Sequence, residues 1–316
     1  MASPRNWQPI LGDFEITQQP IKFIGSIYTD SQSQQQAPRM GLAMCDVGFS
    51  GGTISVAVDY QGAPAIPSAQ IVVYRNAETN SFLSAGIDGG FVTQGTTAQF
   101  LITSFEGGKG GPGFSRLAGT QFVGRPPDDH ITLRLTQRGS MMSLYANDVQ
   151  VLRHTLNSPV PASQCGIYCH ATCTVEFSDY LVDTSSRSAF VIMEFSPPFE
   201  DLFAEVIRPV AQSCGLDAKK ADDVLGPGII IWDLIREIEE ADVVIADITP
   251  INANVYYEIG YAHAMGKPTI LLAERGKELP FDISGFRVLF YDNSIAGKSQ
   301  IEHALRRHIE AVTKEM

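Results

Sequence analysis

The residue of this sequence with the clearest chemical potential is Glu258, which stands in the stretch 241–268. An apolar, β-branched run at 243–248 comes before it and predicts a buried parallel strand. A helix is expected at 255–265, so Glu258 would lie in about its first turn, beyond the carboxyl end of that strand. In open α/β sheets this crevice is where ligands bind. We therefore expect the Glu258 carboxylate to face a ligand.

The expected position of Glu258 also indicates its chemistry. The start of a helix favours an ionised carboxylate, by about 0.3–1 kcal/mol when the group is exposed. An anionic glutamate in a cleft can act as a nucleophile or stabilise a developing positive charge. Both roles suit cleavage of an N-glycosidic bond, because its transition state resembles an oxocarbenium ion. The alternative is an ordinary glutamate that only complements the helix dipole.

Further candidates for the same cleft follow the predicted strands, because the carboxyl ends of parallel strands meet at one edge of a sheet. Tyr261 follows Glu258 by three residues and shares its face, so it could touch the same ligand. His263 lies about 140° round the helix and is expected to pack or face solvent. For Asp247 the alternative is a turn or cap acceptor for nearby backbone N–H groups. The other candidates by position are Phe195, Ser196, Asp222, Asn254, Glu274 and Tyr257.

The composition is that of a globular chain large enough for two domains, since its 316 residues are about twice the usual 150. The net charge of −12 argues against direct binding to nucleic acid, although it leaves room for a nucleotide pocket. No apolar run approaches the roughly 18–20 residues of a membrane span, and the N-terminus lacks the apolar core of a secretory signal. With no signal, the odd number of cysteines, five, favours reduced thiols in the cytoplasm.

The first part of the chain predicts an all-β sandwich at 14–183, preceded by an N-terminal arm at 1–13. Short β-rich runs separated by turn signals recur there without a helical period. A group of cysteine and histidine residues at 165–173 has the ligand types of a zinc site. Familiar zinc sites, however, place two ligand pairs well apart in sequence. The cluster is compact, so buried or edge thiols and no metal site are predicted for Cys165, Cys169, His170 and Cys173.

The second part, 189–316, alternates strands with helices and follows a short polar linker at 184–188. Right-handed crossovers would make it a flavodoxin-like, five-stranded parallel sheet. Pro209 is expected to kink the first helix, and Asn252 and Asn254 are N-cap candidates for the helix of Glu258. The predicted strands are 190–195, 216–221, 243–248, 269–273 and 287–291, and the predicted helices are 199–213, 229–240, 255–265 and 300–312.

The second part resembles the nucleoside 2-deoxyribosyltransferase-like group, which is structurally akin to TIR domains and recurs in bacterial antiphage systems. The resemblance implies that Glu258 is the catalytic carboxylate, that Met193–Phe195 form a wall for base or ribose, and that Asp247 orients the substrate. True deoxyribosyltransferases usually carry an aspartate shortly before this glutamate, where the present chain has Asn252 and Asn254. The segments that carry the resemblance are F-V-I-M-E-F (190–195), A-D-V-V-I-A-D-I-T (241–249), N-A-N-V-Y-Y-E-I-G-Y-A-H-A-M-G-K-P (252–268) and P-F-D (280–282).

The first part resembles a concanavalin A/laminin G-type jelly roll, although more diffusely. Such modules pack against or recognise partners, so a protein or a glycan is the implied ligand. Acidic residues are scattered through this part, and none of their arrangements indicates calcium. The segments that carry this resemblance lie at 49–58, 73–76, 144–149, 165–168 and 175–180.

The leading hypothesis is an enzyme that cleaves the N-glycosidic bond of NAD or a related nucleotide, with NAD as substrate and no cofactor. Nicotinamide leaves NAD without needing a proton, whereas a neutral purine needs a general acid that the sequence does not supply. The resemblance implies an antiphage-type effector that forms homo-oligomers, with the β-sandwich as a sensing or assembly module. The alternatives are a nucleoside 2-deoxyribosyltransferase, a non-enzymatic nucleotide-binding or assembly protein, and a carbohydrate-active jelly roll.

Overall fold

The structure is a computed structural model that describes most of the chain and divides it into two compact units. One unit comprises residues 1–137, 142–154 and 162–185, and the other comprises 138–141, 155–161 and 186–316. None of the helices in the described residues is long and apolar enough to span a membrane. The residues not described are 1–3, 5, 17–19, 30–35, 90–96, 108–112, 122, 158–159, 186, 198, 221–229, 278, 280–282, 284 and 315–316.

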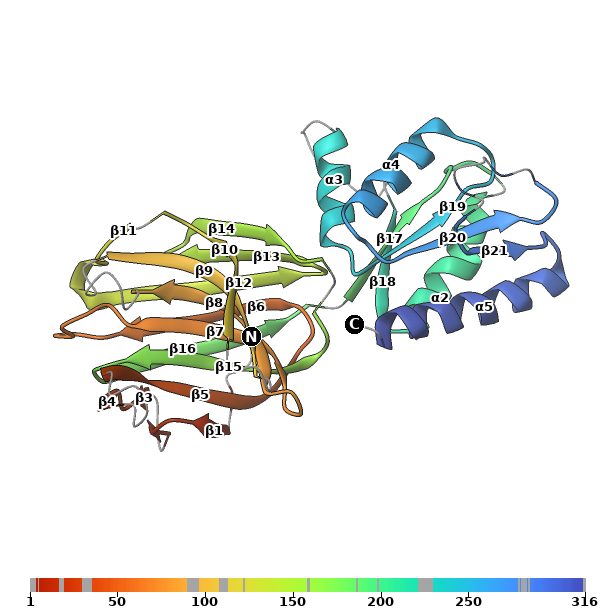
Figure 1. Cartoon of the computed structure of the whole chain (residues 1–316). Coiled ribbons are helices and arrows are strands. Elements are labelled where there is room, and N and C mark those ends of the chain that lie inside the picture. Colours follow the sequence, from red (N-terminus) through yellow and green to blue (C-terminus); the bar gives the residue numbers. More distant parts are fainter. Residues whose placement is uncertain are drawn as a thin grey trace. The chain divides into compact units, whose positions relative to one another are not determined.

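The first unit is a sandwich of two antiparallel sheets, shown in red to green in Figure 1. One sheet has nine strands in the order β1-β5-β15-β7-β8-β9-β10, with β4 and β11 paired to β5 and β9. The other has seven strands in the order β14-β13-β12-β6-β16-β3-β2. The predicted jelly-roll sandwich is confirmed. The strands are β1 (Trp7–Leu11), β2 (Phe14–Glu15), β3 (Ile21–Phe23), β4 (Ile27–Thr29), β5 (Gln36–Phe49), β6 (Gly52–Asp59), β7 (Ser68–Asn76), β8 (Ser81–Asp88), β9 (Thr97–Glu106), β10 (Gly113–Gly119), β11 (Val123–Gly124), β12 (His130–Arg138), β13 (Met141–Ala146), β14 (Val149–Thr155), β15 (Ser163–Ala171) and β16 (Val175–Thr184).

Alternation of apolar and polar residues builds the core of this sandwich. In β12 the side chains of Ile131, Leu133 and Leu135 are buried, and the polar residues between them are not. The predicted N-terminal arm contains the edge strand β1, and Trp7 in it packs edge-on against Tyr180 at 4.8 Å between ring centroids.

The clustered thiols lie within this sandwich. Cys165 and Cys169 are buried, and the Sγ atom of Cys165 lies 3.4 Å from that of Cys45. The Nε2 atom of His170 lies 3.1 Å from the carbonyl oxygen of Pro38. Among the described residues, no three His, Cys, Asp or Glu side chains are grouped so that they could hold a metal.

The second unit is an α/β domain with a parallel sheet in the order β18-β17-β19-β20-β21, which confirms the flavodoxin-like prediction. Figure 1 shows α2 and α5 on one face of this sheet and α3 and α4 on the other. The elements are β17 (Arg187–Ile192), α1 (Phe199–Leu202), a π-helical turn (Phe203–Ile207), α2 (Arg208–Ser213), β18 (Leu216–Lys220), α3 (Ile230–Glu240), β19 (Val243–Asp247), α4 (Ala253–Ala264), β20 (Thr269–Glu274), β21 (Val288–Tyr291) and α5 (Ile295–Lys314).

The sequence of strand β19 is an almost continuous apolar run because both faces of the strand are buried. Val243 and Ile245 pack into the cluster on the α2 and α5 face, and Val244 and Ala246 pack into the cluster on the α3 and α4 face. Both faces of the strand are therefore covered, as is usual for parallel sheets.

Three boundaries differ from the prediction in ways that matter for the site. Strand β17 spans Arg187–Ile192 and not 190–195, so the residues after Ile192 form a connecting loop. In place of the kink expected at Pro209, a π-helical turn at Phe203–Ile207 ends two residues before the proline, whose missing N–H cannot join the regular helical bonding. Helix α4 begins at Ala253, two residues earlier than expected.

Candidate functional site

The strand order of this sheet reverses at the carboxyl ends of β17 and β19. These strands are direct neighbours, whereas β18, which follows β17 in the chain, lies on the other side of β17. Such a reversal of strand order is a topological switch point, where the loops that leave the two strands diverge and a ligand can enter. The loop after β17 and the loop that leads from β19 to α4 flank this point.

Three polar side chains from these two loops meet at the switch point. Glu194, just after β17, accepts a hydrogen bond at Oε1 from Ser196 Oγ at 2.9 Å. Its Oε2 accepts a hydrogen bond from Asn252 Nδ2 at 3.3 Å. Asn252 is the N-cap of α4, and its Oδ1 accepts from the backbone N–H of Asn254 at 2.9 Å. The loop after β17 is thereby tied to the start of the helix that carries Glu258.

Glu258 lies in the second turn of α4, because the helix starts at Ala253. We expected the first turn and a carboxylate stabilised by the helix dipole, but that effect fades beyond the first turn. Burial dominates instead and raises the pKa of the Glu258 carboxyl to about 7. Among the described residues no side chain forms a hydrogen bond or ion pair with it. A half-buried carboxyl with a shifted pKa and no structural partner is a candidate functional group.

The side of α4 that carries Glu258 faces α3. Tyr261, one turn further along, donates its hydroxyl hydrogen bond to Glu239 of α3 at 2.8 Å. Residues three apart lie on one side of a helix, so Glu258 sits on the α3 side, nearer to the switch point than the Tyr261–Glu239 contact. Figure 1 shows α3 and α4 on the same face of the sheet.

Asp247 lies beneath the site as a structural tie. Its side chain is 1% exposed, and it accepts hydrogen bonds from the backbone N–H of Thr249 and from the hydroxyl of Tyr291, both at 3.0 Å. Burial raises the pKa of the Asp247 carboxyl to about 7, although both hydrogen bonds act to lower it. Thr249 in turn accepts from the backbone N–H of Glu274 at 2.8 Å. This geometry agrees with the alternative prediction for Asp247, in which its carboxylate accepts hydrogen bonds from backbone N–H groups of a nearby turn.

The apolar candidates after β17 belong to the core on the α2 and α5 face. Met193 is buried there, and Phe195 packs edge-on against Phe203 at 6.4 Å between ring centroids. The ammonium of Lys220 lies 5.0 Å from the centroid of the Phe195 ring. These side chains therefore support the loop from the opposite face of the sheet.

The remaining candidates divide between the site and the surface. Ser196 joins the network of Glu194, as described above. Asn254 is exposed and takes part through its backbone N–H, and the side chain of Tyr257 is 60% exposed. Asp222 and the Pro-Phe-Asp segment at 280–282 lie outside the described residues.

Two polar residues near the site are not among the candidates predicted from the sequence. Glu194 was grouped with its apolar neighbours, although a carboxylate at the end of an apolar run is itself a signal. Tyr256 carries a hydroxyl that is buried without a hydrogen-bond partner in the described residues. Burial raises the pKa of Tyr256, and the nearby charge of Asp247 adds to this shift.

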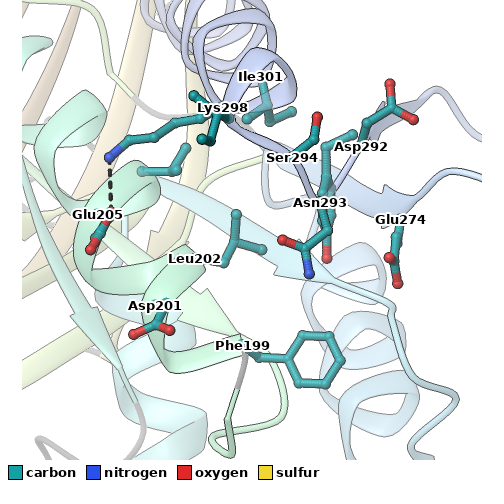
Figure 2. A pocket seen from close by; sticks show the side chains of 13 residues that line it. Phe199, Asp201, Leu202, Glu205, Glu274, Asp292, Asn293, Ser294, Lys298 and Ile301 are labelled. Carbon is teal, nitrogen blue, oxygen red and sulfur yellow. Dashed lines mark hydrogen bonds and ion pairs between the residues drawn. The ribbon is translucent and has the colours of Figure 1, made fainter.

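A separate cavity opens at the ends of β20 and β21, beside the start of α5 (Figure 2). Its volume is about 260 Å³, and Glu258 is not among its lining residues. An ion pair between Glu205 and Lys298, at 2.9 Å, lies in its wall. Tyr291 lines the cavity and connects it to Asp247 through the hydroxyl hydrogen bond. The rest of the lining is Phe199, Asp201, Leu202, Val206, Glu274, Asp292, Asn293, Ser294, Ile295 and Ile301.

Comparison with solved structures returns β-sandwich proteins at low similarity. The carbohydrate-binding module CBM66 from Bacillus subtilis is 12% identical, with 57% of this chain and 96% of that chain covered and a TM-score of 0.41. A prokaryotic β-1,3-1,4-glucanase from a mouse hindgut metagenome is 12% identical, with 55% and 89% covered and a TM-score of 0.38. At these TM-scores the likenesses carry no argument about a ligand.

Comparison of sequences points to the second unit. No curated protein matches the chain. Residues 205–304 match the family model described as nucleoside 2-deoxyribosyltransferase, a range that contains β19, α4 and Glu258. The chain therefore carries a nucleoside 2-deoxyribosyltransferase-like domain in its C-terminal unit.

Proposed function

We propose that the C-terminal domain cleaves or transfers at the N-glycosidic bond of a nucleoside or nucleotide, with Glu258 as the carboxylate that acts at C1′. The family match over 205–304 supports chemistry of this coarse type. The observation that carries the proposal is the Glu258 carboxyl itself, half-buried and unpaired among the described residues, next to the switch point of the sheet. Helix α4 holds this carboxyl beside the switch point, which is where ligands bind in open α/β sheets.

In this mechanism the ionised form of Glu258 is the active one. It attacks C1′ or stabilises the oxocarbenium ion as the bond to the base breaks, and the bonding electron pair leaves with the base. Water, or a second base, then takes the glycosyl group. With a pKa of about 7, a substantial fraction of Glu258 is ionised at neutral pH.

The leaving group decides whether a general acid is needed. Asp247 has a raised pKa, but its side chain is 1% exposed and holds two hydrogen bonds, so it is poorly placed to protonate a leaving base. A base that leaves from a cationic glycoside needs no proton. We therefore favour hydrolysis of NAD or a related nucleotide, with 2-deoxyribosyl transfer as the second candidate because the family match names it.

From the resemblance alone we extend the proposal to the biological role. The chain would act as a TIR-like antiphage effector in the cytoplasm, as a homo-oligomer, with a protein or glycan as the ligand of the β-sandwich. Cells that express the wild type should resist phages that lyse cells expressing Glu258→Gln. Equal phage resistance in both strains would contradict the proposed antiphage role.

The biochemical test is a base-release assay. The purified full chain is incubated with NAD, ribonucleosides and 2′-deoxynucleosides, and free base is measured by chromatography. We expect base release by the wild type and by Glu200→Gln, an exposed carboxylate of α1 that serves as the control. Glu258→Gln should lose release while it keeps the thermal midpoint of the wild type. Appearance of a new nucleoside when a second base is added would identify transfer.

A further inference from the structure

The cavity beside the start of α5 plays no part in the mechanism above, and Glu258 is not among its lining residues. Its volume of about 260 Å³ is far larger than the packing voids of protein interiors, few of which exceed a water molecule. Ligands of open α/β sheets bind outside the carboxyl ends of the strands, and this cavity opens at the ends of β20 and β21. It therefore has the size and the place of a site for a small molecule.

The floor of the cavity is apolar. Val206 of the π-helical turn and Ile301 of α5 are buried there. Phe199 and Leu202 of α1 are partly buried and pack against the same core. These side chains offer hydrocarbon and one aromatic ring as a contact surface. A ligand that covers this floor therefore gains most when its middle part is apolar.

Four carboxylates stand around this floor, apart from one another (Figure 2). Asp201 and Glu205 come from the side of α1 and the π-helical turn. Glu274 and Asp292 come from the ends of β20 and β21. In the described part of the chain, no three acidic, histidine or cysteine side chains are grouped closely enough to hold a metal ion. The arrangement suits an elongated ligand with a positive charge at each end.

The lining holds less positive than negative charge. Lys298 is the one cation among the lining residues, and its ammonium pairs with Glu205 at 2.9 Å. The Asp201 carboxylate forms no ion pair or hydrogen bond with any residue that the structure describes. An added cation would therefore find a carboxylate that no other charge occupies.

Two further cations stand outside the lining. Arg275 pairs with Asp292 at 3.2 Å, and Lys277 pairs with Glu274 at 3.7 Å. Both cations are exposed, and exposed ion pairs are weak, so each can turn to solvent when a ligand takes its place. Even with both counted, negative charge remains in excess at the cavity.

The start of α5 attracts negative charge but does not reverse this balance. The hydroxyl of Ser294 already accepts a hydrogen bond from the backbone N–H of Gly297 at 3.1 Å, and its carbonyl accepts from that of Lys298 at 3.0 Å. A helix end acts as about half a unit of positive charge, which is less than the excess of carboxylates. The cavity therefore disfavours a phosphate group and favours a cation.

We propose that this cavity binds an aliphatic diamine or polyamine, with the methylene chain on the apolar floor and an ammonium group toward the carboxylates on each side. An ammonium group has three donors and no acceptor, so carboxylates satisfy it with strong, charge-assisted hydrogen bonds. The ring of Phe199 is a further surface that attracts a cation. Binding there is independent of the reaction at Glu258, so either can be tested without the other.

Isothermal titration calorimetry of the full chain tests which charge the cavity prefers. The probes are 1,4-diaminobutane, 1,4-butanediol and succinate, whose four-carbon chains end in positive, neutral and negative groups. The diamine should bind at least about tenfold more tightly than the diol, since a hydrogen bond to a charged group is worth that factor or more. Succinate should not bind. Equal affinity for diamine and diol, or no binding of the diamine at millimolar concentrations, would overturn the proposal.

Variants test whether the diamine lies in this cavity. Asn293 is an exposed lining residue, so Asn293→Trp should fill the opening without disturbing the core and abolish binding. Asp201→Asn should raise the Kd of the diamine roughly two- to fivefold. Glu200→Gln removes a neighbouring exposed carboxylate outside the lining and should leave the Kd unchanged. Wild-type affinity in both Asn293→Trp and Asp201→Asn, with unchanged thermal midpoints, would show that the diamine binds elsewhere and would overturn the proposal.

Discussion

The pH dependence of turnover offers a quantitative test of Glu258. Burial raises its pKa from 4.5 to about 7, so the reactive carboxylate form should increase across neutral pH. With that pKa, about 9% of Glu258 is ionised at pH 6 and about 91% at pH 8. The value of kcat/KM should therefore rise about tenfold between these two pH values. A carboxylate with the ordinary pKa would be about 97% ionised at pH 6 already and would give an almost flat profile.

The assay is base release at constant ionic strength from pH 5.5 to 9, with circular dichroism at each pH to confirm that the chain stays folded. Because kcat/KM reports on the free enzyme, its midpoint gives the pKa of unliganded Glu258. Asp247 also has a pKa of about 7, so Asp247→Asn is the matched control and should keep the rising limb. A flat profile, or one that falls as pH rises, would refute the ionised glutamate as the reacting group.

Three further perturbations test the packing around the site. Lys267→Met should lower the free energy of unfolding by about 1–3 kcal/mol, as measured by urea titration. The reason is that the buried ammonium of Lys267 donates hydrogen bonds to the carbonyls of Glu239 and Ala241 at the end of α3. Unchanged stability would contradict this prediction. Asp247→Asn should reduce the pH dependence of stability, because the raised pKa of Asp247 makes the wild type lose stability, by at most about 4 kcal/mol, as pH rises from about 4 to 7. The raised pKa of Glu258 keeps part of this slope in the variant, so a slope equal to that of the wild type would contradict the prediction. Asn252→Ala should cost about 0.5–2 kcal/mol through the lost N-cap, seen as a lower thermal midpoint. Asn252→Ser should keep the cap without placing a second carboxylate beside Glu194, and an equal loss in both variants would argue against the cap.

Much of the α/β domain could be predicted because its signals are local. The apolar run of β19 needs both faces covered, and the asparagine at 252 followed by small and apolar residues favours a helix there. Right-handed crossovers then limit the possible strand orders to a few. The start of the helix of Glu258 was missed by two residues, because a cap at Asn252 and one at Asn254 look alike in sequence.

Elements without a local sequence pattern were harder to predict. Strand β10 has mostly exposed side chains and no alternation, so its pairing with β9 through backbone hydrogen bonds left no periodic pattern to read. Glu194 was hidden for a similar reason. Its partner Asn252 is 58 residues away, and only the fold brings the two loops together.

The most direct measurement is the rate of base release by wild type and Glu258→Gln at pH 8, where about 91% of Glu258 should be ionised. We expect a fall of at least about a hundredfold in the variant, with its thermal midpoint unchanged, since a reacting carboxylate cannot be replaced by an amide. Release at a comparable rate by the folded variant would show that Glu258 is not the reacting group.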